Sequence, residues 1–334
     1  TIAARFGPTR TIIFACLVSA VLWLVMGVFT LTHFEAMQVL VIGAVGIGLL
    51  SGVFSALVPL FSKAYLGRGM TMADAYARLS IPRGVAWALG AAAGGVIIHR
   101  VDPGWGLVAR AGLGLPLALL LIRKPPAEEP AAPAVESGPW ADMWHRFRAN
   151  LRLRRAILLG CGVSMLAAPM VSMIVPIADA LEHKPLIPGA ATLMVTIAIG
   201  QMLAPLVVSL FEKSRPNLQA AALAGLISGF VIAAYGISAL FMRGDPELVV
   251  WGLIGLVFGA LTFGGNSLNL GAATDAADED HAGAMVAAFI FTTSLAAPLG
   301  VLLWGYLMSR YSVETAVLTG AAGTVLVSLP FLRS

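Results

Sequence analysis

The chain has 334 residues, of which 59% are hydrophobic and only 11% are charged, and its net charge is +4. A soluble globular domain carries about 25% charged residues. This composition therefore excludes an ordinary soluble domain and predicts an integral membrane protein. The two cysteines, Cys16 and Cys161, both lie in hydrophobic segments. They predict neither a disulfide framework nor a cysteine-based metal site.

The hydrophobic segments are long enough to be membrane-spanning helices. A spanning helix needs about 20 mostly apolar residues, and the alternating strands of a membrane barrel are absent. The sequence therefore predicts an all-α polytopic membrane protein, a helical bundle with about ten spans. In chain order, we expect spans at about 11–31, 37–61, 80–98, 105–122, 156–178, 189–211, 218–242, 247–270, 284–308 and 313–332.

One long polar segment, 123–155, interrupts the hydrophobic sequence. Its first part is rich in Pro, Ala and Glu, which predicts a flexible tether. In its second part Trp140, Trp144, Phe147 and Leu151 recur at helical spacing with Arg residues between them. This pattern suits a short helix on an anionic membrane surface, and an ordinary solvated linker helix is the alternative.

The linker predicts two unequal half-bundles. Residues 1–122 hold four of the expected spans and residues 156–334 hold six. If the N-terminus is cytoplasmic, 16 of the 21 Lys and Arg residues lie at the inner ends of the spans. Positive charge favours the cytoplasmic side, so we expect both termini and the linker to be cytoplasmic.

Two cytoplasmic segments carry a short motif. The opening IAARFGPTR, just before a span, contains Arg5, Gly7 and Arg10. A second, more degenerate copy, SLFEKSRPN, contains Glu212 and Lys213. Both resemble the Gly-x-Leu-Ala-Asp-Arg-x-Gly-Arg-Arg loop motif of the major facilitator superfamily. With the linker between helices six and seven, as this family has it, the chain would hold helices three to twelve of a twelve-helix fold and lack the first two.

Two further stretches carry the resemblance. In RGVAWALGAAAGGVI, Gly90, Gly94 and Gly95 match the Gly-Pro-x-x-Gly-Gly signature of antiporters in this family, which implies a closely packed helix that can bend. The stretch 264–307 is similar to the drug and siderophore exporters of the enterobactin exporter type. The resemblance implies efflux of a small amphipathic molecule by alternating access, as an antiporter in the bacterial inner membrane.

The coupling ion stays open at this stage. A proton is one partner that the resemblance implies, but the Arg found in helix four of many proton-coupled members is Ala44 here, while Gly48 is kept. The other expected partners are the lipid bilayer and the small-molecule substrate. No nucleic acid is expected, because the basic residues lie next to the spans.

Polar or flexible side chains within spans are the candidates for substrate contact. Ionisable groups in a membrane are functional candidates by default, although Arg83 and Arg110 could instead extend to the interface. The amide side chains could instead bond neighbouring helices, and the flexible Met side chain could simply pack. The candidates are Arg83, Arg110, Gln201, Asn266, Asn269 and Met173.

Two other classes of protein compete with a transporter. The acidic loop with Asp275, Asp278, Glu279 and Asp280 could hold Mg²⁺ in a membrane prenyltransferase, although a second acidic cluster is lacking. A scaffold or assembly factor derived from a transporter is the other. There is no P-loop motif, so an ATP-driven pump is not supported. As the main prediction is a transporter, we expect no enzyme activity, no cofactor and no metal site.

Overall fold

The computed structural model describes residues 7–32, 71–100, 102–113, 115–123, 147–174, 188–241, 245–276 and 282–333, together with residues 42, 43, 46, 47, 50, 54, 57 and 177. Every regular element in these ranges is helical, which confirms the all-α prediction. Seven of the described helices are long and apolar enough to cross a membrane, and a bent pair supplies an eighth. The chain is therefore a multi-pass membrane protein of the predicted class.

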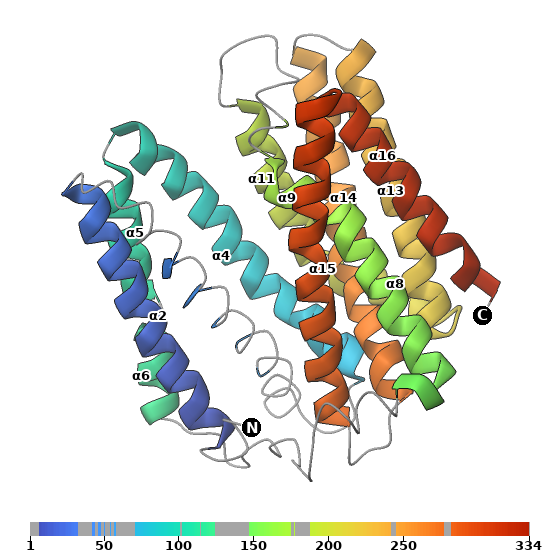
Figure 1. Cartoon of the computed structure of the whole chain (residues 1–334), viewed down its shortest axis with the longest axis horizontal. Coiled ribbons are helices and arrows are strands. Elements are labelled where there is room, and N and C mark those ends of the chain that lie inside the picture. The colour runs from blue at the N-terminus through green and yellow to red at the C-terminus, as the bar shows by residue number, and fades with distance from the viewer. Residues whose placement is uncertain are drawn as a thin grey trace.

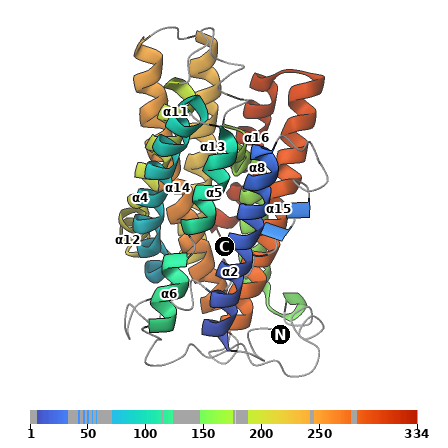
Figure 2. The same ribbon diagram turned by 90° about the vertical axis from the view of Figure 1, so that its left-hand side faces the viewer.

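Three helices form a group at one side of the molecule (Figure 1): α2 (Pro8–Leu31), α5 (Pro103–Leu113) and α6 (Leu115–Arg123). Helix α2 packs against both of the others. At Gly27 the backbones come so close that an added Cβ would lie 3.0 Å from the carbonyl oxygen of Gly104. Small residues permit this close approach between helices in lipid. Figure 2 shows α2 and α5 from the side.

The predicted span at 37–61 lies largely outside the described residues. Several of its described residues lie against α2. Gly43 lies against the side chain of Met26, and Leu57 packs with Ile12 and Cys16. These contacts belong to the same group of helices.

Helix α4 (Met72–Arg100) runs obliquely from this group to the helices of the C-terminal half (Figure 1). It packs against α11 (Pro188–Met202), α12 (Ala204–Glu212) and α14 (Asp245–Asp275). Ala73 and Ala77 are fully buried in a cluster with Leu268 of α14. The start of α4 is thus embedded in the C-terminal helices.

The described residues of the C-terminal half form five further α-helices and a terminal 3-10 helix. Helix α8 begins five residues before the predicted span, so the last residues of the predicted linker belong to it. Just before it, Phe147 packs against a protein cluster with Leu153 and Ala156, whereas Trp140 and Trp144 lie outside the described residues. The elements are α8 (Leu151–Ala167), α9 (Pro169–Ser172), α13 (Asn217–Phe241), α15 (Ala282–Arg310), α16 (Val313–Ser328) and the 3-10 helix η2 (Leu329–Arg333).

Two breaks in these helices coincide with proline residues, whereas Pro82 and Pro298 lie inside the continuous helices α4 and α15. Proline lacks a backbone N–H and cannot continue the helical hydrogen-bond pattern. Pro169 opens α9 after a turn at Ala168. Pro205 follows the break at Leu203, where the axis bends by 45° between α11 and α12. The predicted span 189–211 is therefore a bent pair of helices.

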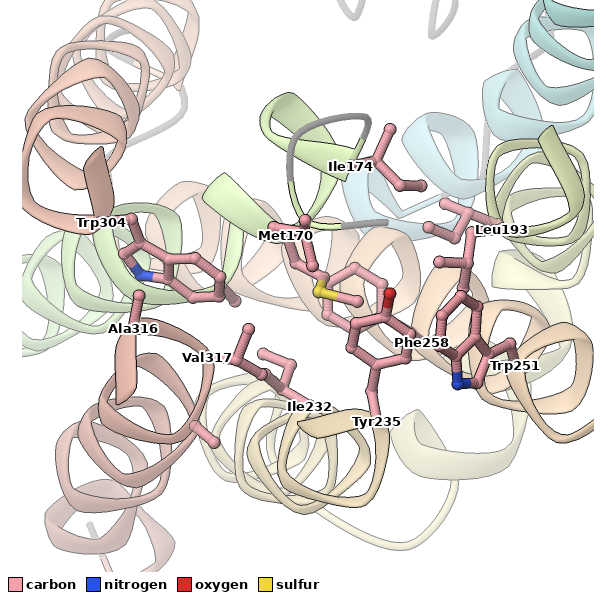
Figure 3. Close-up of a cluster of buried hydrophobic side chains, with 14 residues drawn as sticks. Met170, Ile174, Leu193, Ile232, Tyr235, Trp251, Phe258, Trp304, Ala316 and Val317 are labelled. Atoms are coloured by element: carbon pink, nitrogen blue, oxygen red, sulfur yellow. The ribbon is translucent and has the colours of Figure 1, made fainter. Parts of the chain in front are cut away.

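The main core of the C-terminal half lies between α9, α11, α13, α14, α15 and α16 (Figure 3). Trp251 and Tyr235 are fully buried there, with ring centroids 5.0 Å apart. The indole N–H of Trp251 donates a hydrogen bond of 3.2 Å to Ser238 Oγ. This bond satisfies a polar group that would be expensive to bury alone.

Glycines bring α11 and α14 into backbone contact. An added Cβ at Gly200 would overlap the carbonyl oxygen of Leu256, and one at Gly259 would overlap that of Ile197. The same relation holds between Gly300 of α15 and the carbonyl of Met165 in α8. These side-chain-free positions fix how the C-terminal helices pack around the site described next.

Candidate functional site

A cavity of about 250 Å³ lies between α8, α9, α13 and α14. Its volume is close to the lower end of small-molecule pockets, about 300–1,000 Å³. Much of its wall is apolar, with Leu159, Val163, Val171, Leu261 and Phe263 among the lining residues. Uncharged polar residues complete it: Ser164, Ser172, Ser228, Thr262, Asn266 and Asn269.

One face of α14 supplies three of these polar residues. Thr262, Asn266 and Asn269 follow one another at spacings of four and three, which places them along one side of a helix. Gly160 of α8 makes room for the last of them, since a Cβ there would lie only 2.7 Å from Asn269 Nδ2. The sequence thus combines a polar helix face with a glycine opposite it.

Several polar groups in the wall have no hydrogen-bond partner among the described residues. Ser228 Oγ, Thr262 Oγ1 and Asn269 Oδ1 are buried without a hydrogen bond to any described residue. Ser164 and Asn266 are only partly buried, and within the described ranges no hydrogen bond of their side chains is found either. Most buried polar atoms in proteins are hydrogen-bonded. This concentration of unpaired groups marks the cavity as a place where water or a ligand would be held.

The cavity wall carries no formal charge in the described part of the chain, since none of its lining residues is Lys, Arg, His, Asp or Glu. A buried charge needs a partner of opposite charge or several hydrogen bonds. The wall can therefore orient a ligand by hydrogen bonds but offers no ion pair to it.

The cavity is connected to α4 through an aromatic contact. Phe263 lines the wall, and its ring meets that of Trp87 edge to face, with centroids 6.2 Å apart. Trp87 also packs against the main core. A shift of α4 relative to α14 would thus change the packing around Phe263 in the cavity wall.

The sequence-predicted candidates divide into two groups in the structure. Asn266 and Asn269 lie together in the cavity wall. Met173 caps the C-terminal end of α9, directly after the lining residue Ser172, and packs against the main core. Gln201 lies outside the lining, fully buried near the end of α11, and both atoms of its amide lack a partner among the described residues.

The two candidate arginines also lie outside the cavity lining. Arg83 is exposed on α4, with Nη1 3.5 Å from the hydroxyl of Tyr76 and its guanidinium 5.8 Å from the centre of that ring. Arg110 is exposed on α5 and lies over the ring of Trp23 in α2, 4.7 Å from its centroid. Both contacts are of the cation–π type.

The motif residues take up clear backbone positions where they are described. Gly7 precedes α2 with a φ of 83°, which favours glycine, and its carbonyl oxygen accepts a hydrogen bond from the backbone N–H of Thr11. Gly90 has open space where a Cβ would be added. Arg5 is not described. Further positions are exposed Arg10 on α2, Gly94 and Gly95 within α4, Glu212 at the end of α12 and Lys213 directly after it.

The acidic loop of the prenyltransferase alternative is described only at its start. Asp275 ends α14, and its Oδ2 accepts a hydrogen bond of 2.8 Å from Asn217 Nδ2. The other three acidic residues lie outside the described ranges. Across the part of the chain that the structure describes, no group of three or more His, Cys, Asp or Glu side chains could hold a metal ion.

Ser164, Ser228 and Thr262 are site residues that the sequence did not single out. Single hydroxyl groups are common in membrane helices, where they often bond the carbonyl one turn earlier, as Thr293 does with Phe289. Only the fold shows that these three residues line one cavity. The available signal was weak: Thr262 shares a helix face with two asparagines.

Comparisons with known proteins agree on the class. The family model of the Major Facilitator Superfamily matches residues 1–301. The fucose:proton symporter of E. coli has the same fold with a TM-score of 0.67 at 15% identity, covering 99% of this chain and 85% of that one. A proton:xylose symporter bound to 6-bromo-6-deoxy-D-glucose gives 0.64 at 15% identity, covering 99% and 81%. No curated protein sequence matches the chain.

The fold and the match over most of the chain define a polytopic membrane transporter. The chain belongs to the major facilitator superfamily, whose structurally similar members here are transporters rather than enzymes. This confirms the family that the loop motifs predicted. The protein is accordingly a secondary transporter of small molecules and not an enzyme.

Proposed function

We propose that the protein exports a small amphipathic compound across the inner membrane of a bacterium by alternating access. The observation that carries this proposal is the cavity between α8, α13 and α14, which combines an apolar wall with polar groups that lack a partner in the described residues. An amphipathic ligand would fill the apolar part and supply the missing hydrogen bonds. Export as the direction is supported by the resemblance of 264–307 to exporters.

The moving parts in this proposal are the two half-bundles, 1–122 and 156–334, joined by the linker 123–155. Rocking of two halves about a central site is the usual route of alternating access. Helix α4 belongs to the first half in sequence and packs on α11 and α14 of the second. The proposed sliding surface is therefore the one at which Trp87 meets Phe263.

Within the cavity we assign direct substrate contact to Asn266 and Asn269. We assign Met173, which directly follows the lining residue Ser172, to apolar contact with the substrate at the edge of the cavity. Arg83 and Arg110 are assigned to the approach of the substrate, and Gln201 to a contact made in another state of the cycle. The loop and helix motifs are proposed to serve gating: Arg5, Gly7, Arg10, Gly90, Gly94, Gly95, Glu212 and Lys213.

A proton is the proposed coupling ion. Because the proposed direction of the substrate is export and the proton would enter the cell, the protein would act as an antiporter. This choice is supported by the names of the similar structures, a fucose:proton and a proton:xylose symporter. Cytoplasmic termini and a cytoplasmic linker are proposed from the bias of positive charge. In Figure 1 the N-terminus and the starts of α8 and α15 lie at the same end of the bundle.

The proposal can be tested without knowing the substrate. Cells that express the wild-type protein or the Asn266→Leu variant would be compared by mass spectrometry of their growth medium. At least one small molecule should accumulate outside wild-type cells. Its concentration in the medium should be lower for the variant and lower when the proton gradient is collapsed. Ser309→Ala is a matched control, because Ser309 is exposed near the end of α15 and bonds only its own helix.

Two results would contradict export. If the small molecules in the growth medium are the same for wild-type and variant cells, transport through this site is contradicted. If a compound is instead depleted from the medium of wild-type cells, the direction of transport is import. Export that continues after the proton gradient is collapsed would contradict only the proton as the coupling ion.

A further inference from the structure

The polar groups of the cavity wall can bond both hydrogen-bond donors and acceptors of a ligand. Asn269 Oδ1 is a buried acceptor without a partner among the described residues, so its partner must be an O–H or N–H group. Ser228 Oγ and Thr262 Oγ1 are also without partners there and can both donate and accept. Hydroxyl groups on a ligand meet both demands, because each of them is a donor and an acceptor.

The same wall argues against a charged ligand. Its polar members are hydroxyl and amide side chains, and none of its described lining residues is ionisable. Arg83 and Arg110 are engaged with aromatic rings on α4 and α2 and do not line the cavity. A charge brought into such a wall would lose its hydration without gaining an ion pair.

The arrangement of the wall also limits the shape of the ligand. Val163, Val171, Leu261 and Phe263 line the same cavity as the polar residues of α14. A ligand that carries both hydroxyl and C–H groups matches this mixed lining. The volume of about 250 Å³ suits a compact small molecule.

We infer that the substrate of this cavity is an uncharged, compact molecule that carries several hydroxyl groups, recognised by Ser228, Thr262, Asn266 and Asn269. The inference rests on the proposed function, since it names the substrate class of the same site. It excludes cationic drugs and anionic iron chelators as ligands of this cavity.

A matched set of probes tests the inference on the purified protein. Sorbitol, gluconate and 1-amino-1-deoxysorbitol share a six-carbon polyhydroxylated chain and differ at one end, which is neutral, anionic or cationic. A ligand that binds only the folded state raises the unfolding temperature. Sorbitol should raise it, and neither charged probe should match this effect. Thr262→Val should weaken sorbitol binding about two- to tenfold, while Ser309→Ala should leave it unchanged.

A change of selectivity distinguishes recognition from a structural role. Asn266→Asp places a carboxylate in the wall, so binding of the cationic probe should improve about fivefold or more relative to sorbitol. A variant that is merely damaged would lose all probes equally. The change in relative binding therefore tests the inference even if Thr262→Val folds poorly.

Several outcomes would overturn the inference. Stronger binding of gluconate that is lost in Arg83→Gln would assign the site to anions. If all three probes bind and substitution of Thr262 or Asn266 does not change their binding, the probes bind outside this cavity. No binding of any probe would leave the cavity as a hydrated void and remove the hydroxylated class, while a compound found by the comparison of growth media would still support transport.

Discussion

The ring of Trp87 in α4 meets the ring of Phe263 in α14 edge to face, with centroids 6.2 Å apart and planes inclined at 76°. Phe263 lines the cavity, whereas Trp87 stands on the helix that comes from the N-terminal part of the chain. Through this pair α4 contacts the cavity wall. Any motion between α4 and α14 must change it.

Replacing Trp87 should therefore affect both stability and transport. Trp87→Ala removes an aromatic pair worth about 0.5–1.5 kcal/mol beyond burial, and we expect export to fall several-fold with it. Trp87→Phe retains a ring and should keep most of the export. Unfolding temperature and export would be measured together, with Trp105→Ala as control because Trp105 is 55% exposed. Normal export by Trp87→Ala would show that this contact does not matter for the cycle.

Gly259→Ala and Gly90→Ala should have opposite effects on stability. A Cβ at Gly259 would overlap the backbone of Ile197 in α11, whereas one at Gly90 would meet open space. Overpacking of this kind typically costs about 1–3 kcal/mol, while alanine in an open helix position gains about 0.5–1 kcal/mol. Thermal unfolding in detergent measures both variants. Equal stability of the two variants would refute the close packing of α11 on α14.

The same Gly90→Ala variant tests the gating role proposed for this residue. If Gly90 allows α4 to bend, export should decrease although stability does not. If export is unchanged, the motif resemblance at this position carries no function.

The fold could be predicted largely because helix length and hydrophobicity are properties of local sequence. The limits of α2 and α13 agree with the expected spans at 11–31 and 218–242 to within a few residues. Pro205 permits a bend, but the sequence alone did not predict the break at Leu203, because membrane helices also tolerate proline without a break. Helix α8 starts early at Leu151 because Asn150 caps it, and the arginines that follow looked like linker.

The site was only half predictable. Asn266 and Asn269 could be found as polar residues on one face of a span, but their neighbours on α8 and α13 could not. In a helix that is apolar all round, periodicity does not indicate which face meets which partner. Gly160 shows this well, because only the fold reveals that its missing side chain makes room for Asn269.

Gln201 offers a test of an unpaired buried group. Both atoms of its amide are buried, and no described residue bonds them. An unsatisfied buried polar group costs about 1–3 kcal/mol, so Gln201→Met, which is similar in shape, should unfold at the same or a higher temperature. If the amide finds its partner in another state of the cycle, export should fall in this more stable variant. A clearly destabilised Gln201→Met would mean that the amide is already bonded.

Asn150 joins two helices and should be sensitive to substitution. Its Oδ1 accepts from the backbone N–H groups of Arg152 and Leu153, and its Nδ2 donates to the carbonyl oxygen of Ala276. Loss of such a cap costs about 0.5–2 kcal/mol, so Asn150→Ala should unfold at a lower temperature.

Asn150→Asp separates the two roles of this residue. Aspartate caps a helix as well as asparagine does, but it cannot donate to Ala276. An intermediate unfolding temperature is expected. If Asn150→Asp and Asn150→Ala are equally destabilised, the bond to Ala276 is the important one, and if Asn150→Asp equals the wild type, the cap alone matters.

The most direct test of the account is to block the cavity. Ser164 lies in its wall, is partly exposed and makes no hydrogen bond to another described residue. Ser164→Cys would be made after replacement of Cys16 and Cys161, and export would be measured before and after treatment with a bulky thiol reagent. The account predicts that labelling stops export and that the exported compound slows labelling, while Ser309→Cys keeps its export after labelling. Complete labelling of Ser164→Cys with unchanged export would contradict the claim that substrate passes through this cavity.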